Sequence, residues 1–416
     1  MAANKQILLI NFDFPPNQGI GGRRWGKLAK QLAHEGYHVH VIKADPVEHN
    51  NPSTWSDDVQ HPNIHVHSLP RSYPQVVSHP TGKWIDKLRY RMAVKKLKRI
   101  ERGTIYDISI GWNEVFAPSA AELIQKHNIT NVIATGAPWN VLLYTVQLKE
   151  KFAALNIIVD YRDPWLNARN YGMQNLSPER KQAEVNKQKA VLMYADVVLT
   201  PYEYLTRELE DFAKEHKMGS AKFEVLTHFY DADDIKTTST TNRSDKIVFV
   251  YGGDLYYELD KELELLREQL LQLRNVKPDL YAQVEFRIFS TQPDYKKFEG
   301  LDAVKMNGTI GKKIFEELQR ADFSLVMLSH SKRNDRTTKF FEYLPLRKPM
   351  LVIADAGEVT NFVQQHQLGY VLNETENSLE KILEHRLAGN LNFDAQFDIA
   401  PYSLHQATAQ LIGYLK

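Results

Sequence analysis

The stretch 334–349, which reads NDRTTKFFEYLPLRKP, combines residue types that could bind a phosphate. Thr337 or Thr338 can serve as the N-cap of a short helix, and the two prolines near the end of the stretch predict where that helix stops. The first turn of a helix has unpaired N–H groups and a partial positive charge, and Arg336 and Lys339 stand beside it. The pattern therefore predicts a site for a phosphate or diphosphate.

Glu342 stands one turn further along the same predicted helix. Its carboxylate only accepts hydrogen bonds and would be repelled by a phosphate, unless it reaches past the anion to vicinal hydroxyls such as those of a ribose. The alternative is a solvated glutamate on a helix surface. Beside an anion site, the first interpretation predicts that the ligand is a nucleotide.

A second candidate site follows the predicted strand 157–161, where the chain reads D-Y-R-D-P-W. Ligands of parallel α/β sheets gather at the carboxyl ends of the strands, so Arg162 and Asp163 are candidate catalytic residues. Trp139, after the preceding strand, is expected to line the same cleft as Trp165. The alternative is an ion pair of Arg162 with Asp163 or with Asp160 that braces a loop.

These sites require a framework of alternating strands and helices. The first half predicts strands at 6–12, 39–42, 64–69, 106–110, 131–135, 157–161, 196–200 and 223–227, with helices near 25–36, 118–127, 141–153, 178–194 and 204–216. The second half predicts strands at 247–251, 284–290, 304–306, 323–328 and 350–354, with helices at 259–273 and 313–320. The fold class is α/β, with two doubly wound parallel sheets. Gly21 and Gly22 open the first helix and leave the backbone accessible to a phosphate, although a plain turn would use the same residues.

The predicted domains are 1–230 and 247–401, joined by a Thr/Ser-rich linker at 231–246, with a final helix in 402–416 that returns to the first domain. Of the 416 residues, 43% are hydrophobic and 25% charged, and the net charge of +1 gives no overall preference for nucleic acid or membrane. The chain has no cysteine, its start does not resemble a signal peptide, and no apolar run approaches about 18 residues. We expect a cytoplasmic protein without a membrane span.

The helix predicted at 83–102 is strongly basic, with nine Lys or Arg residues against Asp86 and Glu101, a local net charge of +7. Its apolar positions make it a candidate for binding an anionic membrane surface. The candidate membrane-facing residues are Trp84, Lys87, Arg91 and Lys95. The alternative is a solvated helix whose apolar side packs on its own domain. Its aromatic residues are too sparse for binding single-stranded nucleic acid, and we expect no nucleic-acid partner.

Histidines are frequent between residues 45 and 80, at His49, His61, His65, His67 and His79. Their spacing fits no helical or zinc pattern and no cysteine supports one, so we expect no metal site.

Two patterns resemble GT-B glycosyltransferases, family 4 in particular. K-F-F-E-Y-L-x-L-x-K-P-M-L, beginning at Lys339, is similar to the donor-site helix of that family, in which the glutamate, Glu342 here, holds the nucleotide ribose. F-P-P-x-x-G-x-G-G-R-R-W, beginning at Phe14, is similar to its N-terminal signature. The resemblance implies two Rossmann-like domains facing across a cleft, with the nucleotide sugar held mainly by the second and the acceptor mainly by the first.

The resemblance also implies residue roles. Gly252, Gly253 and Lys261 match positions that bind the diphosphate, while Asp254 replaces an arginine, so Arg287, Arg336 or Lys339 is expected to supply its charge. Gly308 and Thr309 match a loop that lies against the nucleobase. Arg23, Trp139 and Trp165 are expected on the acceptor side. Asn334 replaces a first glutamate, and R-D-P-W replaces a histidine, as in a bacterial subset.

The implied activity is that of a hexosyltransferase: transfer of a sugar from a nucleoside-diphosphate sugar, with retention and without a metal or other cofactor. The acceptor would be a saccharide or a lipid-linked saccharide at the inner face of the cytoplasmic membrane, in synthesis of a bacterial surface polysaccharide or glycoconjugate. A nucleotide-sugar epimerase of the same fold and a catalytically silent scaffold that binds sugar or a partner are the alternatives.

Overall fold

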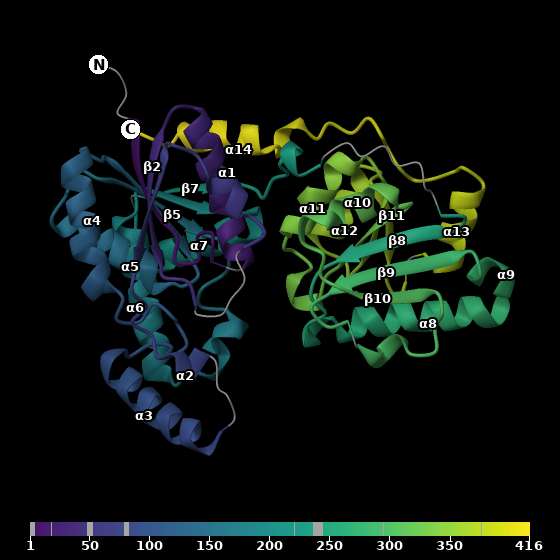
Figure 1. Ribbon diagram of the computed structural model, residues 1–416, viewed down its shortest axis with the longest axis horizontal. Coiled ribbons are helices and arrows are strands. Elements are labelled where there is room, and N and C mark those ends of the chain that lie inside the picture. The colour runs from purple at the N-terminus through teal and green to yellow at the C-terminus, as the bar shows by residue number, and fades with distance from the viewer. Residues whose placement is uncertain are drawn as a thin grey trace. The chain divides into compact units, whose positions relative to one another are not determined.

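The computed structural model describes residues 5–17, 19–47, 53–78, 83–219, 221–235, 244–293, 295–375 and 377–416. The chain divides into two compact units: the first comprises 1–227 with 407–416, and the second comprises 228–406. Each unit contains one parallel sheet covered by helices (Figure 1). Among the described residues, no helix is both long and apolar enough to cross a membrane.

The sheet of the first unit has seven strands in the order β3-β2-β1-β4-β5-β6-β7, all paired in parallel. The strands are β1 (Gln6–Ile10), β2 (His38–Ala44), β3 (Ile64–Leu69), β4 (Asn131–Gly136), β5 (Asn156–Tyr161), β6 (Val197–Thr200) and β7 (Lys222–Val225). Every residue of β4, β5 and β6 is buried, as expected for central strands with helices on both faces.

The helices of the first unit are α1 (Ile20–His34), α2 (Gln75–Ser78), α3 (Trp84–Ile100), α4 (Asn113–His127), α5 (Asn140–Gln147), α6 (Pro178–Tyr194) and α7 (Glu203–Glu215). The chain ends on α14 (Leu404–Ile412), and the last ten residues belong to the first unit. Asn131 at the start of β4 donates to the carbonyl of Lys416 at 2.8 Å, and Asn156 at the start of β5 donates to that of Tyr414 at 2.9 Å. These bonds attach the C-terminus to the amino ends of two central strands.

The sheet of the second unit has six strands in the order β10-β9-β8-β11-β12-β13, again all parallel. The strands are β8 (Ile247–Gly252), β9 (Val284–Ser290), β10 (Val304–Gly308), β11 (Phe323–Met327), β12 (Met350–Ile353) and β13 (Gly369–Leu372). The helices are α8 (Asp260–Val276), α9 (Pro278–Tyr281), α10 (Ile314–Arg320), α11 (Thr338–Tyr343), α12 (Glu358–Gln365) and α13 (Leu379–Leu387). Leu263, Leu266 and Leu270 of α8 pack on Phe249, Phe286 and Phe323 of the sheet in one core cluster.

Most predicted elements are confirmed, but the predicted strand at 106–110 is wrong. Tyr106, Ile108 and Ile110 alternate as in a strand, yet the segment forms turns. The cause is Asp107, a buried carboxylate that accepts hydrogen bonds from the backbone N–H of Trp139 at 2.7 Å and from that of Ser109 at 2.9 Å. Satisfying this carboxylate bends the backbone away from a sheet.

Candidate functional site

Both sheets share one strand order, in which the first and fourth strands of the unit lie side by side. The connections on the two sides of this pair lead to opposite faces of the sheet, so ligands of doubly wound folds bind at the carboxyl ends of these strands. In the first unit the pair is β1 and β4, and in the second it is β8 and β11.

In the first unit, the structure brings the glycine-rich loop and the predicted catalytic pair together. A side chain at Gly21 would collide with the guanidinium of Arg162, and one at Gly22 would collide with the carbonyl oxygen of Asp13. Arg162 Nε lies 3.1 Å from Asp163 Oδ2, and the Asp163 side chain is 51% exposed. The two glycines thus let the β1–α1 loop lie against Arg162, with the Asp163 carboxylate accessible beside it.

Asp160 does not pair with Arg162, so that form of the bracing alternative is wrong. The Asp160 carboxylate is fully buried and accepts hydrogen bonds from Arg24 Nε at 3.2 Å, Trp25 Nε1 at 2.7 Å and Thr135 Oγ1 at 3.2 Å. Because burial of an unpaired carboxylate is costly, this network fixes α1 onto β5. Its role is structural support under the site.

The three residues expected on the acceptor side are all buried in the first unit, and their place at an acceptor site stays a prediction. The indole rings of Trp139 and Trp165 stack with centroids 5.7 Å apart and are 0% and 1% exposed. Trp165 Nε1 donates to Glu184 at 2.6 Å. The guanidinium of Arg23 lies 5.0 Å from the centroid of the Trp55 ring and is also buried. Large aromatic surfaces are stabilised by burial, and here they support the loops that a ligand could contact.

Sequence reasoning missed two charged residues that lie immediately after strands of this sheet. Asp13 follows β1 and Arg71 follows β3, and their carboxylate and guanidinium lie 3.6 Å apart. Burial raises the pKa of Asp13, although Arg71 and Arg162 oppose the shift. The carboxyl-end rule that selected Arg162 would have selected both residues.

In the second unit, Lys339 packs against Gly253 at the end of β8. A side chain at Gly253 would collide with the end of the Lys339 side chain, and Lys339 Nζ lies 5.4 Å from the centroid of the Tyr251 ring. Burial lowers the pKa of Lys339, while the charges of Glu342 and Asp254 oppose this shift. Gly252 similarly leaves room for Ile314 of α10. A desolvated ammonium beside bare backbone is suited to an anion.

Lys339 is the second residue of α11, a short helix as the sequence predicts. It has six residues with Thr337 at the N-cap, where the side chain makes no capping hydrogen bond. Thr338 is the first helical residue, and Phe340 and Phe341 are fully buried. So short a helix has little accumulated dipole, and the charge of Lys339 is the larger attraction for an anion. Glu342 is half-buried one turn further along.

The other predicted donor-site cations already have carboxylate partners. Lys261 Nζ lies 2.9 Å from Asp355 and 3.3 Å from Glu374, while Arg336 lies 3.4 Å from Glu358. The expected role of Arg287 in neutralising phosphate does not fit the structure. Arg287 stands in the middle of β9 and forms ion pairs with Glu285 at 2.6 Å and Glu317 at 2.9 Å, away from the carboxyl end of the sheet.

The residues expected beside a nucleobase lie on the edge strand of the same sheet. Gly308 ends β10 and Thr309 follows it, and both are exposed. Two strand spacings, about 10 Å, separate β10 from β8. Because the strands are parallel, Gly308 and Thr309 lie at the carboxyl ends of the strands, as Gly253 does.

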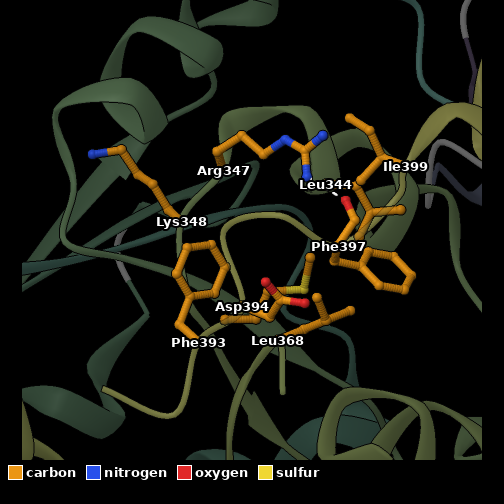
Figure 2. A pocket seen from close by; sticks show the side chains of 9 residues that line it. Leu344, Arg347, Lys348, Leu368, Phe393, Asp394, Phe397 and Ile399 are labelled. Atoms are coloured by element: carbon orange, nitrogen blue, oxygen red, sulfur yellow. Dashed lines mark hydrogen bonds between the residues drawn. The ribbon is translucent and has the colours of Figure 1, made fainter. Parts of the chain in front are cut away.

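A pocket of the second unit lies elsewhere. Arg347, Lys348 and Leu368 border it, at the amino ends of β12 and β13, with Leu344, Met350, Phe393, Asp394, Phe397 and Ile399 (Figure 2). Arg347 Nη1 donates to the carbonyl of Ala395 at 3.3 Å and to that of Phe397. None of the predicted donor residues lines this pocket, which is at the opposite ends of the strands from the switch point.

Four histidines of the first unit, His40, His65, His67 and His127, form a stack, while His61 contacts His34. His65 and His67 of β3 stack against His40 of β2, with ring centroids 4.9 Å and 5.7 Å apart, and the ring of His127 lies 4.0 Å from that of His40. Among the described residues, no three histidines bring ring nitrogens within 4.8 Å of one another. Two of the candidates, at 49 and 79, lie outside the described residues.

No protein-family model and no curated protein matches the chain. Solved structures do match it. The structure of HepE from Anabaena, in complex with UDP and glucose, is similar over 99% of each chain, with a TM-score of 0.63 and 13% sequence identity. The chain has the GT-B fold. The predicted pair of doubly wound parallel sheets is thereby confirmed.

Two further GT-B structures are similar over nearly the whole chain. A UDP-forming α,α-trehalose-phosphate synthase from Burkholderia vietnamiensis has a TM-score of 0.63 and 12% identity, covering 100% of this chain and 98% of its own. A putative UDP-N-acetylglucosamine 2-epimerase from Listeria monocytogenes has a TM-score of 0.52 and 14% identity, covering 99% and 95%. The GT-B fold thus occurs among these neighbours with more than one activity.

Proposed function

We propose that this chain is a glycosyltransferase that transfers a hexosyl group from a nucleoside-diphosphate sugar to a saccharide or lipid-linked saccharide. The observation that carries the proposal is the packing of Lys339 against Gly253 at the switch point of the second sheet. Support comes from the GT-B fold, and from HepE, a neighbour of this fold whose structure contains UDP and glucose.

In this proposal the second unit binds the donor. Lys339 neutralises the negative charge that grows on the leaving diphosphate, and because its ammonium is already desolvated, little solvent reorganisation is needed during the reaction. The bare backbone of Gly252 and Gly253 lets the phosphates approach. Glu342 accepts hydrogen bonds from the ribose, and Gly308 and Thr309 lie against the base. A lysine can stabilise the leaving group without a metal, so no metal is required.

The first unit binds the acceptor. Asp163 presents an exposed carboxylate, and Arg162 holds it at 3.1 Å, so a sugar hydroxyl could donate to Asp163 without displacing a buried partner. Retention of anomeric configuration, a place in bacterial surface polysaccharide or glycoconjugate synthesis, and a cytoplasmic location belong to the proposal through the resemblance to family 4.

The test is a binding panel of UDP, GDP, ADP, TDP and CMP, followed by thermal unfolding. A nucleotide present at about 100 times its dissociation constant should stabilise the protein by about 2.7 kcal/mol. Glu342→Ala should weaken binding of the preferred nucleotide about tenfold and leave inorganic diphosphate binding unchanged, because the carboxylate is assigned to the ribose. Glu380→Ala on α13 is the matched control. If no nucleotide stabilises the protein, the donor site is refuted.

The epimerase is the second candidate, because the Listeria putative epimerase shares the fold. It would convert a UDP-sugar without any acceptor, and product analysis of such a mixture distinguishes the two enzymes. A silent scaffold, favoured by Asp254 and Asn334 at positions where the family has an arginine and a glutamate, would show no turnover in either mixture.

A further inference from the structure

Helix α3 has two apolar faces, and its own unit covers only one of them. Leu97 is 2% exposed and packs in a cluster with Tyr73, Val77, Ile105 and Ile110. Tyr90, Ala93 and Val94 of α3 pack against the same cluster. Residues 90, 93, 94 and 97 share one side of the helix, so this side attaches α3 to the first unit.

The second apolar face points to solvent. Trp84, Leu88 and Met92 follow one another at intervals of four residues and are 77%, 55% and 57% exposed. Ile85, beside them, is 45% exposed. At 100° per residue these side chains lie on the side of the helix opposite Leu97. We call Trp84, Ile85, Leu88 and Met92 the outer stripe. A contiguous exposed apolar patch of this kind marks an interaction surface.

Basic residues flank the outer stripe, and the two acidic residues of the segment have partners. Lys87, Arg91 and Lys95 are exposed on the same outward side of α3. Asp86 lies 3.6 Å from Arg89, and Glu101 lies 2.7 Å from Lys187 of α6. Among the described residues, no carboxylate pairs with the three flanking cations. The outward face is therefore apolar along its centre and cationic along its margin.

We propose that the outer stripe of α3 docks on the surface of an anionic phospholipid bilayer, with the helix lying in the plane of the interface. Lipid headgroups complement the flanking cations, while the acyl boundary takes up Trp84, Leu88 and Met92. Nucleic acid fits less well, because the stripe offers one aromatic ring and no series of stacking platforms. In Figure 1, α3 lies at the margin of the first unit, away from the sheet, as docking requires.

Bilayer docking specifies the acceptor of the proposed glycosyltransferase, because an enzyme bound to a bilayer meets lipid-linked acceptors. In that respect it rests on the proposed function. The physical docking needs no nucleotide. If the protein binds vesicles but no nucleotide, the bilayer-binding surface is supported and the donor site is refuted. The reverse result refutes the bilayer surface alone.

The experiment is flotation of the full chain with vesicles of phosphatidylcholine, with and without about 30% phosphatidylglycerol. We expect binding to the anionic vesicles that weakens with added salt, and little binding to the neutral ones. Trp84, which is 77% exposed, can report on the bilayer, since Trp25, Trp112, Trp139 and Trp165 are at most 1% exposed and Trp55 is half-buried beside Arg23. Its emission should shift to shorter wavelength on anionic vesicles, and Trp84→Phe should remove that shift while preserving flotation.

Two variants separate charge from insertion. Lys87→Gln with Arg91→Gln and Lys95→Gln should lower the vesicle binding constant about 100-fold. Leu88→Ser with Met92→Ser should lower it at least tenfold and suppress the Trp84 shift. The matched control is Leu387→Ser with Lys381→Gln on α13, where Leu387 is 55% exposed, and it should bind as the wild type does. Unchanged melting temperatures show that the variants fold.

Three results would overturn the proposal. One is equal binding to neutral and anionic vesicles, and another is flotation of both α3 variants at the wild-type level. The third is binding to heparin with the same salt dependence and no Trp84 shift on vesicles, which would assign the face to a soluble polyanion.

Discussion

The two sheets share one strand order, but the charged side chains at their carboxyl ends differ in whether they form ion pairs. In the first unit the charges occur in pairs: Asp160 with Arg24, Asp163 with Arg162, and Asp13 with Arg71. In the second unit Lys339 is desolvated, and no described carboxylate forms an ion pair with it. The fold therefore does not determine which chemistry its binding edge performs; the side chains at the strand ends do.

The difference indicates what each edge can accept. A ligand that meets paired charges gains little by bringing its own charge, so the first edge suits uncharged polyols that exchange hydrogen bonds. At the second edge an anion could form with Lys339 the ion pair that no described carboxylate forms with it, and binding would recover part of its desolvation cost. This agrees with an acceptor in the first unit and a diphosphate in the second.

The largest expected effect tests whether the first unit's charges are structural. Asp160→Asn removes the counter-charge of the buried Arg24 guanidinium. Its remaining partners are two neutral acceptors, the carbonyls of Leu226 and Thr227. The substitution should lower the free energy of unfolding by about 3–5 kcal/mol, as measured by urea denaturation. Asp163→Asn, whose side chain is 51% exposed, should cost at most about 1 kcal/mol while reducing transfer. Equal losses for the two would remove the distinction between support and site.

The second prediction concerns pH and is specific to the first unit. Burial, with His127, His65, His67 and His38 nearby, lowers the pKa of His40 to about 4 from its ordinary value of 6.5. Between these values the unfolded chain binds a proton that the folded chain excludes, so stability rises with pH from about 4 to 6.5 and is lost on acidification. The loss amounts to up to about 3 kcal/mol.

His40→Gln measures that contribution. Urea denaturation at a series of pH values should give a flatter profile between pH 4 and 6.5 for this variant than for the wild type. His405→Gln, on α14, is the control and should retain the wild-type slope. A slope unchanged by His40→Gln would mean that other groups of the histidine stack carry the pH dependence.

Sequence periodicity was sufficient to predict most of the strands and helices. The boundaries of β3, α6 and β9 match the predicted ranges 64–69, 178–194 and 284–290 to the residue. Their apolar spacing and capping residues act locally, so they can be read without tertiary information. The segment 106–110 failed because its conformation depends on Asp107 bonding to Trp139, a residue distant in sequence.

Residue types at the site were easier to predict than residue partners. The carboxyl-end rule selected Arg162 and Asp163, and the helix pattern selected Lys339, but neither could show that Trp139 and Trp165 stack on each other in the core. Sequence reasoning also could not tell whether Lys339 or Arg287 is the cation that lacks a carboxylate partner. The glutamates that pair with Arg287 come from another position of its strand and from α10. Burial and pairing arise from tertiary packing, which one sequence does not contain.

The third prediction compares two lysines of the second unit. Lys339→Met removes the desolvated charge and should weaken binding of the preferred nucleoside diphosphate about 10–100-fold in calorimetry, since charge-assisted hydrogen bonds contribute about 1.5–3 kcal/mol. The variant should be about as stable, because a half-buried lysine is replaced by an apolar chain of similar length. Lys261→Met removes an ammonium that is already paired, on a side chain that is 51% exposed, and should weaken binding no more than about threefold. The reverse order would assign the diphosphate to Lys261.

The smallest expected effect tests the contact that joins Lys339 to the backbone. Gly253→Ala places a methyl group where the end of the Lys339 side chain now lies, so the ammonium must move. Because that end is flexible, stability should change little, and nucleoside-diphosphate affinity should fall about fivefold, near 1 kcal/mol. If the loss acts through Lys339, adding Gly253→Ala to Lys339→Met should weaken binding no further than Lys339→Met alone. Gly219→Ala in the first unit, where a side chain would also meet open space, is the control and should be neutral in the same cycle. Additive losses in the double variant would mean that Gly253 acts on the ligand directly, by admitting a phosphate to the backbone, and that the lysine contacts the ligand independently.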